Sequence, residues 1–239
     1  MKPIKGYIFI DIDGTLVDKD LRLNSRDVES IHKALAHDYD VILASGRPTP
    51  FVRWMAHQIH ESVSVCGFNG ADIEGTVLGC IDDTVIKILS NLDLNMIFKN
   101  HSGYYSNRLT IPQAFNYDMI GNYPRQLHPL SDILKVLIWV DAKEYDTVKT
   151  MLESIEDISI TYYEPKGFEL SAKGIDKGKA ITHYVQDNIP IYSIGNDTND
   201  LPMFEVSDAS YIVGNKLSGH RVESVSEAII EILKGGNIE

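Results

Sequence analysis

The feature that most constrains the fold is a short apolar run near the N-terminus that ends in two aspartates. Residues 7–10 are Tyr, Ile, Phe and Ile, and Asp11, Ile12 and Asp13 follow directly. Such a run is typical of a strand buried on both faces. Because side chains alternate along a strand, Asp11 and Asp13 are expected to point to one side and Ile12 to the other. Two carboxylates this close repel each other unless a cation or a shared proton intervenes, so the pattern predicts a metal site, an acid/base pair, or both.

Strands and helices alternate around this run and again in the last third of the chain. Strands that are apolar on both faces and alternate with helices indicate an α/β protein with a Rossmann-like parallel sheet covered by helices. Ligands of such sheets bind beyond the carboxyl ends of the strands. The predicted strands span residues 7–10, 39–44, 62–66, 191–194 and 211–213. The predicted helices run from Asn24 or Ser25 to about His37, onward from Pro48, and over residues 177–185, 200–206 and 224–233.

The pattern changes near residue 80 and resumes near residue 173. Between these points, residues 135–141, 158–163 and 168–171 read as strands, with a helix over 142–154, while residues 101–129 show little periodicity. We therefore expect a discontinuous core domain, residues 1–80 and 173–239, with an α+β cap domain inserted over residues 81–172.

Composition excludes some classes of partner. The chain has 239 residues, 22 basic against 34 acidic, and a net charge of −12. Such acidity disfavours binding to nucleic acid or to an anionic membrane surface. Two cysteines form no disulfide framework, no apolar run approaches the ~20 residues of a membrane span, and the N-terminus does not resemble a signal peptide. A cytoplasmic protein is predicted, and its oligomeric state stays open between monomer and dimer.

Four motifs stand in order at predicted strand ends or helix starts. They are Asp11-Ile12-Asp13-Gly14-Thr15, Ser45-Gly46-Arg47, Lys177 after Gly174-Ile175-Asp176, and Gly195-Asn196-Asp197-Thr198-Asn199-Asp200. Their order resembles that of the haloacid dehalogenase superfamily of phosphatases across essentially the whole chain. The insertion and the stretch Asn69-Gly70-Ala71 resemble its Cof-like branch, which carries a type IIB cap.

The resemblance implies a Mg²⁺-dependent phosphatase that works through a phosphoaspartate. Asp11 is the expected nucleophile and Asp13 the acid/base residue, whose backbone carbonyl also contacts the metal. Ser45 is expected to bind a phosphoryl oxygen and Lys177 to neutralise charge. Residues expected to contact phosphate or substrate are Gly14, Thr15, Gly46, Arg47, Asn69 and Asn199. For Arg47 the alternative role, bracing the loop, is favoured. Expected metal ligands are Asp11, Asp13, Asn196, Asp197 and Asp200.

The last motif departs from the pattern Gly-Asp-x-x-Asn-Asp that the resemblance implies. Asn196 stands where the first aspartate is expected, and Asp197 adds an acid beside it. An amide oxygen can ligate Mg²⁺ but brings no negative charge, so Asp197 or Asp200 is a candidate for supplying it.

The expected substrate is a small phosphorylated metabolite, with a sugar phosphate favoured. Aromatic and basic residues of the inserted region are weaker substrate-binding candidates: Tyr104, Tyr105, Arg108, Tyr117, Tyr123, Arg125 and Glu169. His57 and His60 lie three residues apart in the helix predicted from Pro48 onward, a spacing used by some metal sites, but with no further clustered ligand they are read as surface residues. Alternative functions are a phosphomutase, a catalytically weakened member of the family with a binding or regulatory role, and a receiver-like signalling domain, which the insertion disfavours.

Overall fold

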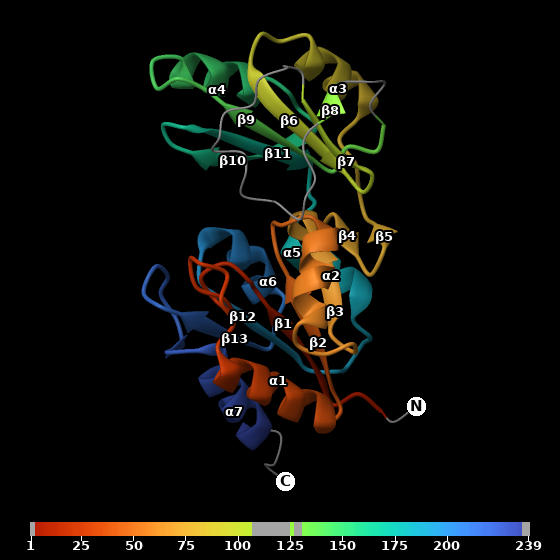
Figure 1. Cartoon of the computed structure of the whole chain (residues 1–239), viewed down its shortest axis with the longest axis vertical. Coiled ribbons are helices and arrows are strands. Elements are labelled where there is room, and N and C mark those ends of the chain that lie inside the picture. Colours follow the sequence, from red (N-terminus) through yellow and green to blue (C-terminus); the bar gives the residue numbers. More distant parts are fainter. Residues whose placement is uncertain (1–2, 107–124, 127–130, 236–239) are drawn as a thin grey trace. The chain divides into compact units, whose positions relative to one another are not determined.

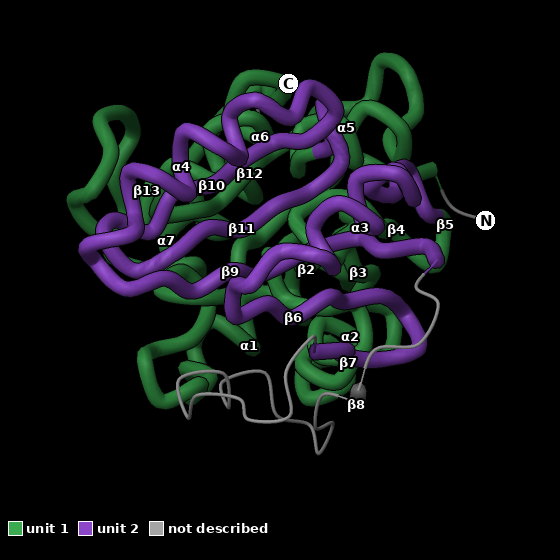
Figure 2. Tube along the Cα trace, turned by 90° about the horizontal axis from the view of Figure 1, so that it is seen from above, with its two compact units in different colours: residues 1–76, 176–239 green, residues 77–175 purple. Residues whose placement is uncertain are grey.

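The structure is a computed structural model that describes residues 3–106, 125–126 and 131–235. The chain divides into two compact units (Figure 2): the core unit, residues 1–76 and 176–239, and the inserted unit, residues 77–175. The sequence placed the same two boundaries at residues 80/81 and 172/173. Within the described residues, no helix has the length and apolar character needed to cross a bilayer.

The core unit is built on one eight-stranded sheet in the order β14-β13-β12-β1-β2-β3-β4-β5. Neighbouring strands from β14 to β3 are parallel, and β4 joins β3 antiparallel. The predicted α/β class with a parallel sheet is therefore confirmed. Its strands are β1 (Gly6–Ile10), β2 (Tyr39–Ala44), β3 (Ser64–Gly67), β4 (Asp72–Ile73), β5 (Thr76–Val77), β12 (Ile191–Gly195), β13 (Ala209–Val213) and β14 (Arg221–Val222). Its helices are α1 (Ser25–Ala36), α2 (Thr49–His57), η1 (Phe68–Gly70), α5 (Lys177–Tyr184), η3 (Thr198–Asp200), α6 (Leu201–Glu205) and α7 (Val225–Gly235).

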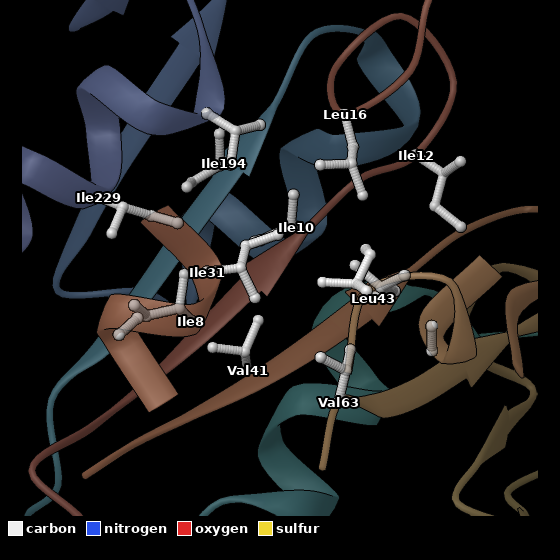
Figure 3. Close-up of a cluster of buried hydrophobic side chains, with 14 of the residues drawn as sticks. Ile8, Ile10, Ile12, Leu16, Ile31, Val41, Leu43, Val63, Ile194 and Ile229 are labelled. Carbon is white, nitrogen blue, oxygen red and sulfur yellow. The ribbon is translucent and has the colours of Figure 1, made fainter. Parts of the chain in front are cut away.

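Strand β1 is buried on both faces, as its composition predicts. Ile8 and Ile10 point into a hydrophobic cluster with Ile31 of α1 and Ile229 of α7 (Figure 3). Phe9 faces the other way, where its ring meets Tyr184 of α5 edge-on. The alternation continues past the end of the strand, since Ile12 joins the first cluster. Asp11 therefore emerges on the side of the sheet where α5 begins.

The register of the parallel strands brings their carboxyl ends together. Ile10 pairs with Ile194 of β12 and Leu43 of β2, and the Asp11 amide donates to the Ile194 carbonyl at 2.9 Å. The Ser45 amide donates to the Cys66 carbonyl, also at 2.9 Å. The segments that begin at Asp11, Ser45 and Asn196 thus leave adjacent strands at one edge of the sheet (Figure 1).

The inserted unit is an α+β fold with its own core. Its six-stranded sheet has the order β10-β11-β9-β6-β7-β8, and α3 and α4 pack their apolar residues against it. Its elements are α3 (Asp83–Ser90), β6 (Asn95–Asn100), β7 (Gly103–Ser106), β8 (Arg125–Gln126), β9 (Lys135–Trp139), α4 (Tyr145–Glu153), β10 (Ile158–Tyr163) and β11 (Gly167–Ala172). The sequence anticipated β9, α4, β10 and β11 but not α3, β6 or β7. The candidates Arg108, Tyr117 and Tyr123 lie outside the described residues.

The reading of two histidines as surface residues holds, but the helix assumed for them does not. Helix α2 ends at His57, so His60 lies beyond it. Both side chains are exposed, and the His60 ring meets that of His32 edge-on.

Gly70 provides a test of the turn that joins β3 to β4. Its φ is +99°, and a Cβ would lie 2.0 Å from the Asp176 carbonyl oxygen just before α5. Gly75 also has a positive φ, +83°, but has open space around it. We expect Gly70→Ala to lower the free energy of unfolding by about 2–4 kcal/mol, from backbone strain and a steric clash. Gly75→Ala carries the strain alone, about 1–2 kcal/mol. Urea unfolding of both variants measures the difference, and equal losses would contradict the clash.

Candidate active site

A buried ionic cluster of two aspartates and one lysine lies where β1 and β12 end. The Lys177 ammonium, on the first residue of α5, donates to Asp11 Oδ1 at 2.7 Å and to Asp200 Oδ1 at 2.6 Å. Lys177 and Asp200 are 0% exposed and Asp11 is 4% exposed. Residues from three distant parts of the sequence thus form one group, and the sequence had named all three.

Burial and mutual attraction shift the pKa values of this cluster in a consistent way. Burial raises the pKa of Asp11 to about 6, against the lowering effect of Lys177. Burial by itself would lower the pKa of Lys177, but Asp11 and Asp200 raise it above its usual range. The lysine therefore stays charged, and Asp11 is a carboxylate whose negative charge is only partly compensated.

Asp200 also holds the loop that follows β12. Its Oδ2 accepts the backbone N–H groups of Asn196 at 2.8 Å and Asp197 at 3.1 Å. These bonds and the lysine occupy both carboxylate oxygens with donors from the protein. Asp200 therefore braces Lys177 and the Asn196 loop rather than pointing its oxygens into open space.

Asp197 is engaged differently from its neighbours. Its Oδ1 accepts the Thr198 N–H at 2.8 Å, which caps η3, and its Oδ2 pairs with the ammonium of Lys216. Burial raises the pKa of Asp197, but Lys216 and Thr198 outweigh it and hold the pKa below its usual range. Sequence reasoning did not name Lys216. Its position just after β13, beside β12, was the available signal.

Asp13 forms a two-pronged ion pair with Arg47. Arg47 Nε donates to Asp13 Oδ2 at 3.0 Å and its Nη2 to Oδ1 at 2.7 Å. The Arg47 guanidinium also lies 4.7 Å from the centre of the Phe51 ring. The sequence had placed Arg47 among the phosphate- or substrate-binding residues, and the structure gives it the predicted acid/base residue as a partner.

Ser45 is the first residue after β2 and begins the loop that carries Arg47. Its side-chain oxygen accepts the Arg47 N–H at 3.1 Å, so its own hydroxyl hydrogen is left to donate elsewhere. Its carbonyl accepts the Asn69 N–H at 2.9 Å, which ties η1 to the same loop. Asn69 Oδ1 is buried and makes no hydrogen bond within the described structure, so this side chain, predicted to bind phosphate or substrate, retains unused hydrogen-bonding capacity. Thr15, the other such candidate here, lies beside Asp11 and lowers the pKa of that carboxyl.

The turn at Gly14 brings Asn196 close to the Asp13 loop. Gly14 has a φ of +81°, and a Cβ there would lie 2.3 Å from Asn196 Nδ2. Only glycine accommodates both the backbone angle and the close amide. Asn196 is 8% exposed, so its side chain is held at the strand edge rather than in solvent.

The oxygen donors at this edge fit a hard divalent cation. The candidate donors are the Asp11 carboxylate, the Asp13 backbone carbonyl and the Asn196 amide, and Mg²⁺ prefers oxygen ligands. In the described part of the chain, no three acidic, histidine or cysteine side chains are grouped so as to hold a metal. A cation here would therefore depend on neutral oxygens and water as well as on Asp11.

The remaining candidate residues are not members of the buried cluster of Asp11, Lys177 and Asp200. Gly46 is half-buried within the Ser45–Arg47 turn, and Asn199 is half-buried on η3. In the inserted unit, Glu169 pairs with the buried Lys135 at 2.7 Å, and Lys99 lies 5.1 Å from the centre of the Tyr104 ring. Tyr105 is half-buried on β7. The substrate roles predicted for these residues of the inserted unit stay predictions.

Comparison with known proteins agrees with this arrangement. A family model described as haloacid dehalogenase-like hydrolase matches residues 8–231. A phosphoglycolate phosphatase of Thermoplasma volcanium is 30% identical over 203 residues, which cover 83% of this chain and 80% of that protein. A haloacid dehalogenase-like hydrolase from Bacteroides thetaiotaomicron has a TM-score of 0.81 at 21% identity, over 95% of this chain and 99% of that one. A sugar phosphatase described as subclass IIB has a TM-score of 0.76 at 20% identity, over 98% and 100%.

The chain belongs to the haloacid dehalogenase-like hydrolases. The predicted assignment to this superfamily and its Cof-like branch is confirmed, and so is the predicted enzyme class, a phosphatase. The structural likenesses, at about one residue in five identical, establish the shared fold.

Lys177 should be essential for stability as well as for charge balance. We expect Lys177→Met to lower the free energy of unfolding by about 3–5 kcal/mol, because Asp11 and Asp200 lose their shared cation while buried. Lys179→Met, two residues along α5 at an exposed position, is the matched control and should change it by less than about 0.5 kcal/mol. Chemical denaturation of both variants without added divalent cation measures the effect. Similar losses in both would mean that the buried pairs contribute nothing specific.

Proposed function

We propose that this enzyme is a Mg²⁺-dependent phosphatase that hydrolyses a small phosphorylated metabolite through a phosphoaspartate on Asp11. The observation that carries the proposal is the buried cluster of Asp11, Lys177 and Asp200 at the carboxyl end of β1. A carboxylate held by a fixed lysine, with hydroxyl and amide groups beside it, suits attack on an anionic phosphoryl group.

Each residue of the site then has a defined task. Asp11 attacks phosphorus, and the bond to the leaving oxygen breaks as the new Asp11–phosphorus bond forms. Lys177 offsets the charge that Asp11 shares with the phosphoryl group, while the Ser45 hydroxyl donates to one phosphoryl oxygen. The buried Thr15 hydroxyl lies beside the Asp11 carboxylate, whose pKa it lowers, and is a second donor available to the phosphate.

Asp13 acts as acid and then as base, and Arg47 positions it. In the first step Asp13, released from Arg47 and protonated from solvent as the substrate binds, gives that proton to the leaving alcohol. In the second step the Asp13 carboxylate takes a proton from the water that hydrolyses the phosphoaspartate. Because both carboxylate oxygens are held by the Arg47 fork, the carboxylate has one preferred orientation before substrate binds. Proton transfer requires this pair to loosen as the substrate arrives.

The cation would be held by Asp11, Asn196 and the Asp13 carbonyl. When bound it reduces the repulsion between the Asp11 carboxylate and the phosphate. Asp200, through its bonds to Lys177 and to the Asn196 and Asp197 amides, holds those residues in place around it.

The substrate is proposed as a phosphorylated sugar or a short phosphorylated acid. A sugar phosphate is suggested by the predicted cap, which would select the leaving group. A short phosphorylated acid is suggested by the relatives named as phosphoglycolate phosphatases. A screen of phosphorylated sugars and phosphoglycolate against the purified protein separates the two classes.

A non-catalytic binding role is the second candidate, because Asn196 is uncharged at the expected metal position. Hydrolysis of a generic aryl phosphate decides between the two functions, since a binding protein gives no turnover with any divalent cation.

Asp11→Asn should abolish hydrolysis without loss of fold. An amide is a far weaker nucleophile than a carboxylate, so we expect kcat for an aryl phosphate to fall by about 10³-fold or more. Asp20→Asn, on the exposed part of the loop after β1, is the control and should retain full activity. Steady-state hydrolysis with Mg²⁺ measures both. Equal rates in wild type and Asp11→Asn would refute the nucleophile assignment.

Arg47→Ala should slow the hydrolysis of substrates whose leaving group needs a proton more than the hydrolysis of substrates whose leaving group does not. Alkyl phosphates have basic leaving groups and rely on Asp13. Their kcat is therefore expected to fall by about tenfold or more, a part of the ~10²–10⁴-fold that acid catalysis contributes. For an aryl phosphate with an acidic leaving group the loss is expected to be severalfold smaller. Arg53→Ala, on α2 and paired with Glu74, is the matched control. An equal loss on both substrates would assign Arg47 to phosphate binding instead.

A further inference from the structure

We propose that the divalent cation and the phosphoryl group bind to this site cooperatively, each strongly only when the other is present. The reason is that the core unit supplies too little negative charge to hold the cation alone. This inference rests on the proposed function, and it concerns how the residues of this chain divide the charge around Asp11.

The charged groups of the site are almost all paired within the protein. Asp13 is neutralised by Arg47, and Asp197 by Lys216. Asp11 and Asp200 share the single charge of Lys177, whose Nζ lies 2.7 and 2.6 Å from them. These seven charged side chains carry a net charge of one negative unit, and Asn196 adds none. A divalent cation bound alone would therefore leave the site positive.

The candidate cation ligands themselves also carry little negative charge. Asp200 Oδ1 accepts the lysine, and Oδ2 accepts two backbone N–H groups, so this carboxylate is directed into the protein. Asp11 is then the one charged candidate ligand among the described residues, beside the neutral Asn196 amide and the Asp13 carbonyl. Cation affinity rises with the number of charged oxygen ligands, so we expect the free enzyme to bind Mg²⁺ weakly.

The substrate's phosphoryl group brings the missing charge. A phosphate monoester carries about −1.5 to −2 at neutral pH and offers oxygens to the same cation. Asp11 and Asn196 are 4% and 8% exposed, so opposite charges placed here are weakly screened by water. Cation and phosphate should therefore raise each other's affinity, and thermodynamic linkage requires the two factors to be equal.

Titration calorimetry of the wild-type protein tests this directly. Mg²⁺ is titrated without and with saturating inorganic phosphate, and phosphate is titrated without and with Mg²⁺. We expect each ligand to increase the affinity of the other by the same factor, about tenfold or more. Equal Mg²⁺ affinity with and without phosphate would overturn the inference.

Asn196→Asp tests the origin of the coupling. A carboxylate at this position adds the absent charge, so Mg²⁺ affinity without phosphate should rise by about tenfold and the coupling factor should shrink. The thermal midpoint of the variant should also rise more on adding Mg²⁺ than that of wild type, which gives a readout independent of calorimetry.

Asp197→Asn is the matched control, because it changes the charge of the neighbouring residue in the same loop. Its carboxylate is not among the candidate ligands and pairs with Lys216 at an exposed position, where water screens the charge. Mg²⁺ affinity should therefore change by less than about twofold. A fall as large as the rise in Asn196→Asp would show that Asp197 supplies the charge, and would overturn the inference.

The outcomes also separate this inference from the proposed function. Tight Mg²⁺ binding without phosphate, unchanged in Asn196→Asp, overturns the inference and leaves metal-dependent hydrolysis intact. Absence of Mg²⁺ binding to the wild type, with phosphate or without it, overturns both. Hydrolysis that persists in a chelator would then identify the metal requirement as the failed step.

Discussion

The buried contact of Lys177 with Asp11 and Asp200 is the interaction on which the rest of the site depends. Two carboxylates and an ammonium are almost completely buried. The cost of removing each charge from water is offset only by its attraction to the others. Through Asp200 the same contact fixes the backbone of Asn196 and Asp197. The position of the loop after β12 is therefore tied to the first residue of α5 and to the first residue after β1. A change at any one of the three alters the charge and the geometry of the others.

Much of this arrangement could be predicted because parallel strands bring chemistry-bearing residues to one edge. The run that ends at Asp11 and the apolar strand before Ser45 each have a clear composition, and strand ends in a parallel sheet converge. The alternation of Asp11 and Ile12 followed from strand geometry alone and agrees with the cluster that Ile12 joins. Asp11 and Ser45 were therefore placed by strand geometry, while Lys177 and Asp200 were named through the family resemblance. The structure joins Asp11, Lys177 and Asp200 by direct bonds.

What could not be predicted depends on side-chain partners and on short or irregular elements. The Arg47 fork on Asp13 joins residues 34 apart, and nothing in their spacing requires it. Lys216 was missed because a lone lysine in a loop is ordinarily a solvated residue. In the inserted unit, β6 has only three apolar residues in a row, residues 96–98, between Asn95 and the buried Lys99, and it pairs with the short strand β7, so neither strand was recognised. Helix α3 was missed although its sequence carries helix signals, since Asp82 caps its start and Val85, Ile86 and Leu89 form one buried face.

Charge pairing explains why an uncharged Asn196 is compatible with a phosphoryl-transfer site. If every acid around Asp11 were unpaired, the resting pocket would repel an anionic substrate before any cation arrived. Pairing Asp13 with Arg47 and Asp197 with Lys216 leaves a single net negative charge, to which cation and phosphate contribute opposite signs. A carboxylate at position 196 would favour the cation at the expense of the empty site, where Asp11 and Asp200 already share one lysine. The amide keeps the empty site closer to neutral, and under the proposed cooperative binding the substrate's phosphoryl group would supply the negative charge that position 196 lacks.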